Sequence, residues 1–248
     1  MSTTAVRTGV LALNFDGVIG DSLEGGLLIS WNAHMRAPVR AFVEPGPAVA
    51  PPDVVDRFTC CRPFTRHVGH WLVPFVIRSM PTARVESAAR YDELCAPTIE
   101  VFACAAEDYR TEVRRGHPGQ WLAHHRVQPG IDEVVADAYI VTAREGESVR
   151  QILSAHAMGV DETRILESCT DRQRALESIA AGEDLAPADR TLVDDNIDNC
   201  LAACAAGYGV WWSTWGHEAA ADEAPAVARG ITAMSIDVAR EAAAPRTR

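Results

Sequence analysis

The chain has 248 residues, 48% of them hydrophobic, which suits one large folded domain or two smaller ones. Its formal net charge is −11, and an acidic surface argues against nucleic acid or an anionic membrane as a partner. There is no apolar signal segment at the N-terminus and no run long enough to span a membrane, so we expect a cytoplasmic protein. Seven cysteines at irregular spacing indicate free thiols and not a disulfide framework.

Short apolar runs recur along the chain, and several stop at polar residues, as buried parallel strands do. They cover residues 9–13, 138–141, 191–193, 208–212 and 231–236. Helical patterns lie between these runs or follow them, over residues 145–158, 171–181 and 196–206. Because strand and helix alternate, the sequence predicts an α/β fold with a doubly wound parallel sheet.

The segment after the first strand is different, because it is helical in pattern with few strand signals. Its candidate helices cover residues 23–35, 54–61, 66–79 and 83–115, and Pro/Gly-rich stretches lie at residues 44–52 and 116–119. We therefore predict a core domain of residues 1–22 and 129–248 and an inserted α-helical cap domain of residues 23–128. An insertion at this point would lie over the strand ends as a lid does.

Asn14 and Asp16 follow the first apolar run and are followed at once by Gly17. Side chains alternate along a strand, so Asn14 and Asp16 point the same way where the strand ends. In a parallel sheet, ligands bind at the carboxyl ends of the strands. The pattern predicts a ligand site at this edge. Taken alone, this stretch is better explained by a turn that uses Asn, Asp and Gly for its geometry, and further motifs in order are needed to favour the ligand site.

Four short motifs in order resemble those of the haloacid dehalogenase (HAD) superfamily of phosphohydrolases. Residues 14–18 (Asn-Phe-Asp-Gly-Val) correspond to the first motif, Asp-x-Asp-Gly-[Thr/Val], and Thr142 closes an apolar strand as the second motif does. Arg172, with Arg174 as the alternative, stands for the basic third motif, and residues 194–196 (Asp-Asp-Asn) match the acidic fourth motif. The resemblance covers about residues 8–22 and 129–215. The insert matches the family's helical cap only in position and character.

The resemblance implies a phosphatase that acts on a small phosphorylated metabolite through an aspartyl-phosphate. Position 14 would hold the nucleophile, and Asp16 would be the general acid and base. Thr142, the backbone at Ala143 and Arg172 would bind the phosphoryl group, with Arg66 as a candidate substrate contact from the cap. Mg²⁺ would be held by position 14, the backbone carbonyl of Asp16, and Asp195. The sequence leaves the oligomeric state open.

Asn14 departs from this scheme, because a neutral amide is a very poor nucleophile. Its oxygen could still ligate Mg²⁺, and the loss of one negative charge would favour a bound phosphate. One explanation is an engineered Asp-to-Asn change made to trap a substrate, which the intact remaining motifs favour. The other is a natural HAD-fold protein that binds a phosphorylated ligand without hydrolysis. A phosphomutase on the same fold is a further alternative.

Histidines and tryptophans in the insert have simpler interpretations than a second site. His67 and His70, like His124 and His125, invite a zinc interpretation, but no Cys or acidic residue stands at a convincing ligand spacing in the sequence. We therefore expect ordinary packing or surface histidines, with Arg62, Arg66, His67 and His70 as candidate contacts to a polar substrate. The tryptophans of the insert are expected to pack in its core: Trp31, Trp71 and Trp121.

Overall fold

We describe the chain from a computed structural model. It describes residues 9–21, 23–35, 50–77, 88–96, 98–183, 185–216 and 223–243. Residues 44–49, 78–79 and 83–87, which fall in the expected Pro/Gly stretch and helices of the insert, lie outside these ranges. The chain divides into two compact units. Unit 1 comprises residues 1–21, 127–218 and 222–248, and unit 2 comprises residues 22–126 and 219–221.

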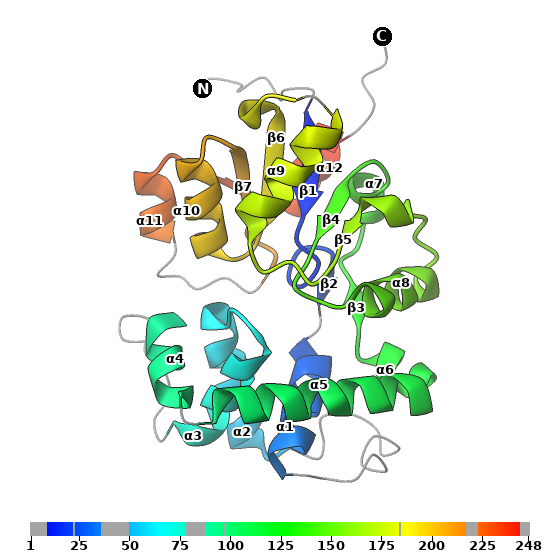
Figure 1. Cartoon of the computed structure of the whole chain (residues 1–248), viewed down its shortest axis with the longest axis vertical. Helices are drawn as coiled ribbons and strands as arrows, with labels where there is room; N and C mark the ends of the chain where they lie inside the picture. The colour runs from blue at the N-terminus through cyan, green and yellow to red at the C-terminus, as the bar shows by residue number, and fades with distance from the viewer. Residues whose placement is uncertain are drawn as a thin grey trace. The chain divides into compact units, whose positions relative to one another are not determined.

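Unit 1 is built on a six-stranded parallel sheet with the order β5-β4-β1-β6-β7-β8 (Figure 1). The strands are β1 (Val10–Leu13), β4 (Tyr139–Val141), β5 (Ile165–Leu166), β6 (Arg190–Asp194), β7 (Gly209–Ser213) and β8 (Thr232–Met234). The predicted doubly wound α/β fold is confirmed. The two-residue β5 was not predicted from the sequence, because a run that short carries no periodicity.

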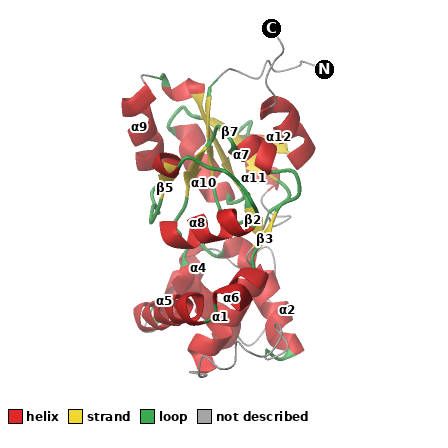
Figure 2. Cartoon of the chain, turned by 90° about the vertical axis from the view of Figure 1, so that its right-hand side faces the viewer, coloured by secondary structure: helices red, strands yellow, loops and turns green. Residues whose placement is uncertain are grey.

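Helices cover both faces of this sheet, and α9 and α12 lie on opposite faces in Figures 1 and 2. The helices of unit 1 are α7 (Asp132–Val135), α8 (Gly146–Ala155), α9 (Arg172–Glu183), α10 (Ile197–Ala205), α11 (Glu223–Ala228) and α12 (Ile236–Ala243). Leu176 and Ile179 of α9 pack with Leu192 of β6 in a cluster of fully buried side chains. Burial of this apolar surface fixes the sheet and with it the loops at its carboxyl edge.

Unit 2 is helical in its described residues. It contains α1 (Leu23–Met35), α2 (Pro52–Cys61), α3 (Val73–Val76), α4 (Ala88–Cys95), α5 (Ile99–Gly116), α6 (Pro118–Ala123) and the 3₁₀ turns η3 (Arg62–Phe64) and η4 (Val68–Leu72). β2 (Gly20–Asp21) and β3 (Arg126–Val127) pair where the chain passes between the units. No helix in the described parts of the chain is both long and apolar enough to cross a membrane.

Two of the expected helices of this segment are interrupted. The pattern over residues 66–79 forms η4 and the short α3, which begins just before Pro74. The pattern over residues 83–115 forms α4 and α5, and the sequence has a proline at position 97, between them. Proline removes a backbone donor and disfavours helix at the residue before it, so apolar periodicity alone overestimated both lengths. Trp121 is 1% exposed, and Trp31 and Trp71 pack against the cluster of Leu27, Val54 and Phe58.

Candidate functional site

The carboxyl ends of three neighbouring strands place polar side chains at one edge of the sheet in unit 1. β1 lies between β4 and β6. Asn14 and Thr142 directly follow β1 and β4, and Asp194 is the last residue of β6. The backbone N–H of Asn14 donates to Val193 O at 2.9 Å, which extends the β1–β6 pairing by one residue. Asn14, Thr142 and Asp194 are all buried. Ligands bind at this edge in parallel α/β sheets.

The side-chain amide of Asn14 is hydrogen-bonded at both ends. Its Nδ2 donates to the backbone O of Asp16 at 2.8 Å. The same nitrogen lies 3.3 Å from Asp194 Oδ1 and 3.1 Å from Asp195 Oδ1. Its Oδ1 accepts from Phe15 N at 2.9 Å and from Arg172 Nη2 at 3.0 Å. The amide therefore has carbonyl and carboxylate oxygens on one side and N–H donors on the other.

Arg172, at the start of α9, carries the guanidinium that reaches this centre. Besides its bond to Asn14, its Nε lies 3.4 Å from Asp194 Oδ2, and its Nη1 donates to the backbone O of Cys169. Arg172 is buried, whereas Arg174 is exposed, and the backbone N–H of Arg174 donates to Asp171 Oδ1. Of the two arginines considered for the third motif, Arg172 is the one in contact with Asn14.

Asp16 is held by an arginine that the sequence analysis did not select as a site residue. Arg144 Nη2 donates to Asp16 Oδ1 at 2.6 Å and Arg144 Nε donates to Asp16 Oδ2 at 3.2 Å. The Arg144 side chain is 3% exposed, its Cζ lies 5.6 Å from the centre of the Phe15 ring, and its Nη1 donates to Ser148 Oγ at 3.2 Å. A buried, two-pronged Arg–carboxylate pair is among the stronger polar contacts in proteins.

The two acidic residues at the end of β6 differ in their surroundings. Asp194 Oδ1 accepts from Asn196 N at 2.9 Å, and its Oδ2 accepts from Asn199 Nδ2 at 2.9 Å, so it anchors the start of α10. Asn196 caps the same helix through a bond from Asp198 N. Asp195 follows the strand, is 5% exposed, and its backbone O accepts from Trp212 Nε1 at 3.1 Å. Asp195 is the acidic residue next to Gly17.

The turn after β1 depends on glycine. Gly17 has φ +88°, and a Cβ built on it would lie 2.0 Å from Asp195 Oδ2. A Cβ on Gly216 would lie 2.4 Å from the backbone O of Gly17, so a second segment crosses the turn closely. Trp215 Nε1 also donates to Val18 O at 2.9 Å. Only glycine allows both this backbone conformation and the close approach of the carboxylate.

Thr142 and Ala143 begin the loop after β4. The Oγ1 of Thr142 accepts from Arg144 N at 3.0 Å, and the backbone O of Thr142 accepts from Cys169 N at 2.8 Å. These bonds orient the Thr142 side chain and leave its hydroxyl hydrogen as a donor. Ala143 is exposed.

Solved structures similar to this chain include proteins whose titles name hydrolases, phosphatases and a kinase. A putative haloacid dehalogenase-like hydrolase from Bacteroides fragilis aligns with a TM-score of 0.59 at 14% identity, covering 92% of this chain and 96% of that one. A predicted phosphoglycolate phosphatase from Haemophilus somnus 129PT aligns with a TM-score of 0.51 at 16% identity, over 87% and 88% of the two chains. Protein Tyrosine Kinase A of Mycobacterium tuberculosis has a TM-score of 0.56 at 18% identity, over 96% and 99%. The chain has the haloacid dehalogenase-like fold.

Sequence comparison adds no closer relationship, since no protein-family model and no curated protein matches the chain. On the haloacid dehalogenase-like fold, the structure gathers Asn14, Asp16, Thr142, Arg172 and Asp195 in unit 1. Arg66 belongs to unit 2, where its Nη1 donates to Pro63 O at 2.9 Å.

The sequence analysis did not select Arg144 as a site residue, and it placed Asp194 in the fourth motif without giving it a role. Arg144 stands two residues after the strand-ending Thr142, and its partner Asp16 is 128 residues away in the chain. Asp194 directly follows the apolar pair Leu192 and Val193 at the end of β6 and is fully buried, and a buried carboxylate needs partners.

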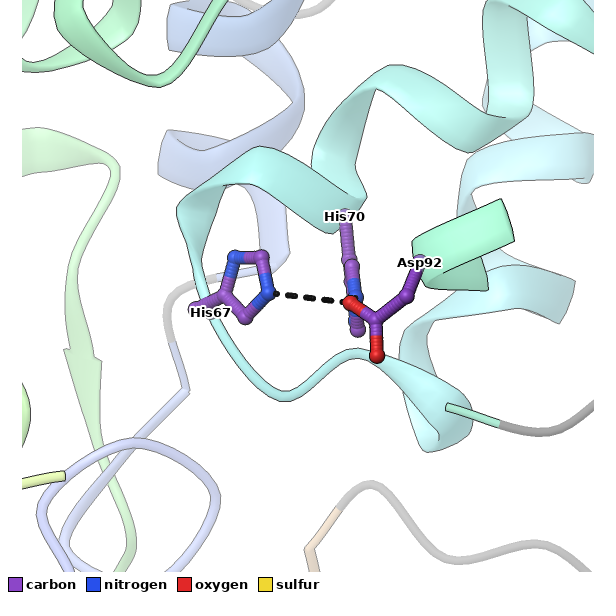
Figure 3. A group of neighbouring side chains, drawn as sticks. All are labelled: His67, His70 and Asp92. Carbon is purple, nitrogen blue, oxygen red and sulfur yellow. Dashed lines mark hydrogen bonds and ion pairs between the residues drawn. The ribbon is translucent and has the colours of Figure 1, made fainter. Parts of the chain in front are cut away.

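The histidines of unit 2 have an acidic neighbour that spacing along the chain does not suggest (Figure 3). Asp92 of α4 has its Oδ1 2.8 Å from His70 Nε2 and 3.6 Å from His67 Nε2, and the three could hold a metal ion by distance. However, Arg66 N donates to His70 Nδ1 at 3.2 Å, so the proton of a neutral His70 is on Nε2 and points at Asp92. A metal at Nε2 would need the other tautomer, and the cluster is a hydrogen-bonded His70–Asp92 pair with the His67 ring tilted against His70 at a centroid distance of 3.9 Å.

The residues expected to hold Mg²⁺ do not fit the ion as they stand. Asp195 Oδ1 and the backbone O of Asp16 are oxygen atoms of the kind that Mg²⁺ binds. Asn14, however, directs Nδ2 toward both of them and keeps its only oxygen on the opposite side, against Phe15 N and Arg172. A metal site with an N–H group among its ligands is chemically inconsistent.

Proposed function

We propose that this chain binds a small phosphorylated molecule at the carboxyl edge of the unit 1 sheet and does not hydrolyse it. The site is that of a HAD-type phosphohydrolase with the nucleophilic position filled by an amide. The observation that supports this most is Asn14, buried between the Arg172 guanidinium and the carboxylates of Asp194 and Asp195. The site would therefore keep the binding groups and lack the covalent step.

Asn14 offers no nucleophile to a phosphorus atom. An amide nitrogen shares its lone pair with the carbonyl group, and the hydrogens of this one face carboxylates. The amide oxygen is neutral and already accepts bonds from Phe15 N and Arg172. An aspartyl-phosphate needs a carboxylate oxygen at this position, so that intermediate cannot form on Asn14.

Asp16 is also poorly placed to act as the proton donor of a hydrolase. A general acid must carry a proton and deliver it to the leaving oxygen. Both oxygens of Asp16 face N–H groups of Arg144, at 2.6 and 3.2 Å. This pairing suits a carboxylate that remains ionised and fixed, as in a structural or binding role.

The groups that would bind a phosphoryl group are retained. Arg172 brings a guanidinium to the strand ends, and Thr142 has a hydroxyl hydrogen free to donate, which are typical partners of phosphate oxygens. Three carboxylates and two guanidinium groups meet here, Asp16, Asp194 and Asp195 against Arg144 and Arg172. A carboxylate at position 14 would add another negative charge, so Asn14 reduces the repulsion of an incoming phosphate.

Calorimetric titration with matched pairs of phosphorylated metabolites and their dephosphorylated forms tests this proposal. We expect binding of at least one phosphorylated member with no binding of its dephosphorylated partner, and no phosphate release during the titration. Asn196→Asp, which adds one negative charge beside the site and retains a helix-capping oxygen, is the control for unspecific charge effects. Equal binding of both forms of every pair, or release of phosphate by the unaltered chain, would refute the proposal.

A further inference from the structure

We infer that the Asn14 amide replaces a carboxylate together with its bound cation, so that the centre of unit 1 is closed by hydrogen bonds and is independent of Mg²⁺. The three oxygen atoms around Nδ2 are the backbone O of Asp16, Asp194 Oδ1 and Asp195 Oδ1, at 2.8, 3.3 and 3.1 Å. Oxygen atoms that converge on one point repel each other unless a positive group stands there. Here the N–H hydrogens of Asn14 are that group.

The orientation of the amide follows from its neighbours. Oδ1 faces two donors, Phe15 N at 2.9 Å and Arg172 Nη2 at 3.0 Å. Turning the amide by 180° would direct its N–H groups at these donors and its oxygen at the carboxylates. Donors and acceptors around the side chain therefore select one orientation, as they do for buried amides in general.

An aspartate in the same place would have a different requirement. One of its oxygens could accept from Phe15 N and Arg172, as Oδ1 of Asn14 does. The other would face the oxygens of Asp16, Asp194 and Asp195 with no hydrogen to donate. A carboxylate at position 14 thus needs a cation on that side, whereas an amide offers hydrogen-bond donors there and an acceptor on the other side.

Mg²⁺ would have to turn this amide in order to use it as a ligand. The turn removes the acceptor of two buried donors, Phe15 N–H and the Arg172 guanidinium, and points two further N–H groups at them. A buried polar group without its partner is costly, and two such losses correspond to an affinity lower by about 30-fold or more. Asp195 and the carbonyl of Asp16 would also lose the Asn14 donor.

Mg²⁺ titration of the unaltered chain and of Asn14→Asp, without any phosphate ester, tests this inference. Mg²⁺ is the probe because it prefers oxygen ligands, so the histidines near Asp92 do not compete. We expect Asn14→Asp to bind Mg²⁺ at least about 30-fold more tightly and to gain thermal stability from it. The unaltered chain should melt at the same temperature in Mg²⁺ and in a chelator. Gln173→Glu, which adds the same charge at an exposed position of α9, should behave as the unaltered chain.

Mg²⁺ binding by the unaltered chain within threefold of Asn14→Asp would overturn the inference, if the binding is lost in Asp195→Asn. If Asn14→Asp does not fold, the test uses the unaltered chain without it. A rise in the melting temperature of the unaltered chain with millimolar Mg²⁺, abolished by Asp195→Asn, would also overturn the inference. Because no phosphorylated ligand is present, failure here leaves the proposed ligand class untouched. Failure of phosphate-ester binding would likewise leave this inference standing.

Discussion

Arg144 donates a hydrogen bond to each carboxylate oxygen of Asp16, with N–O distances of 2.6 and 3.2 Å. The pair connects the loop after β4 to the turn after β1. The Arg144 side chain is 3% exposed against 27% for Asp16, so the arginine is the buried partner and the carboxylate lies nearer to solvent. This arrangement fixes Asp16 in place and occupies the hydrogen-bonding positions that a proton donor would need.

Removing the two hydrogen bonds from Arg144 should make Asp16 a better general acid in a variant that has a nucleophile at position 14. In the Asn14→Asp background, we expect phosphate release from alkyl esters, whose leaving groups need a proton, to rise by about tenfold on Arg144→Gln. Release from p-nitrophenyl phosphate, whose leaving group needs none, should change by less than threefold. An equal effect on both substrates would show that Arg144 does not act through Asp16.

Arg172 should contribute strongly to the affinity for a phosphorylated ligand. Arg174, on the same helix, provides a matched control. A charge-assisted hydrogen bond is worth about 1.5–3 kcal/mol, so Arg172→Gln should weaken binding of a phosphorylated ligand by about tenfold or more. The exposed Arg174→Gln should leave the affinity within twofold, and Arg172→Lys should restore part of the loss by returning the charge. Titration calorimetry measures all three. Equal losses in the two Gln variants would contradict the assignment.

Gly17 should tolerate no side chain. Gly17→Ala combines an unfavourable φ of +88° with a clash at 2.0 Å from Asp195 Oδ2. Gly207 has φ +84° and open space around a built Cβ, so Gly207→Ala isolates the cost of the backbone conformation. We expect the free energy of unfolding to fall by about 1–2 kcal/mol in Gly207→Ala and by at least about 2 kcal/mol more in Gly17→Ala, measured in urea. Similar losses would mean that the Asp195 carboxylate moves aside easily.

Stability should fall in mild acid because of His70. Burial is the main cause that lowers the pKa of His70 below 6.5, and nearby His67 and Arg66 add to it, whereas Asp92 opposes it. The unfolded chain therefore takes up a proton at higher pH than the folded chain does. The contribution of neutral, buried His70 to the free energy of unfolding is fully present above pH 6.5. It declines as the pH falls from there toward the lowered pKa of His70.

Unfolding of His70→Gln at pH 7.5 and pH 5 tests this effect. We expect a smaller loss between the two pH values than in the unaltered chain, while His156→Gln, at an exposed position of unit 1, keeps the full loss. The hydrogen bond from His70 also lowers the pKa of Asp92, which adds a second loss only below its ordinary value of 3.8. An unchanged pH response in His70→Gln would assign the effect to other groups.

The sequence was informative where a local pattern determines structure. Apolar runs that end at Asn14, Thr142 and Asp194 predicted the strands, because burial on both faces of a parallel sheet demands such runs. The resemblance of the motifs suggested which polar residues would meet at one edge. β5 and the break between α4 and α5 were missed, since a two-residue strand has no period and apolar spacing does not register a proline.

The rest depended on contacts between distant residues. Arg144 and Asp16 are 128 positions apart, and Asp92 is 22 positions from His70, so neither pair has a local signature. The direction of the Asn14 amide depends on donors and acceptors from its own turn, from the residues after β6 and from Arg172. A sequence shows that an amide is present, but only its surroundings decide which end faces the carboxylates.

The most direct test of the account is phosphate release from a panel of phosphorylated metabolites by the unaltered chain and by Asn14→Asp, each with Mg²⁺. The account predicts no release above the uncatalysed rate by the unaltered chain, and turnover of at least one substrate by Asn14→Asp, since the carboxylate supplies the missing nucleophile. Release by the unaltered chain at a rate comparable to Asn14→Asp would contradict the claim that position 14 blocks hydrolysis.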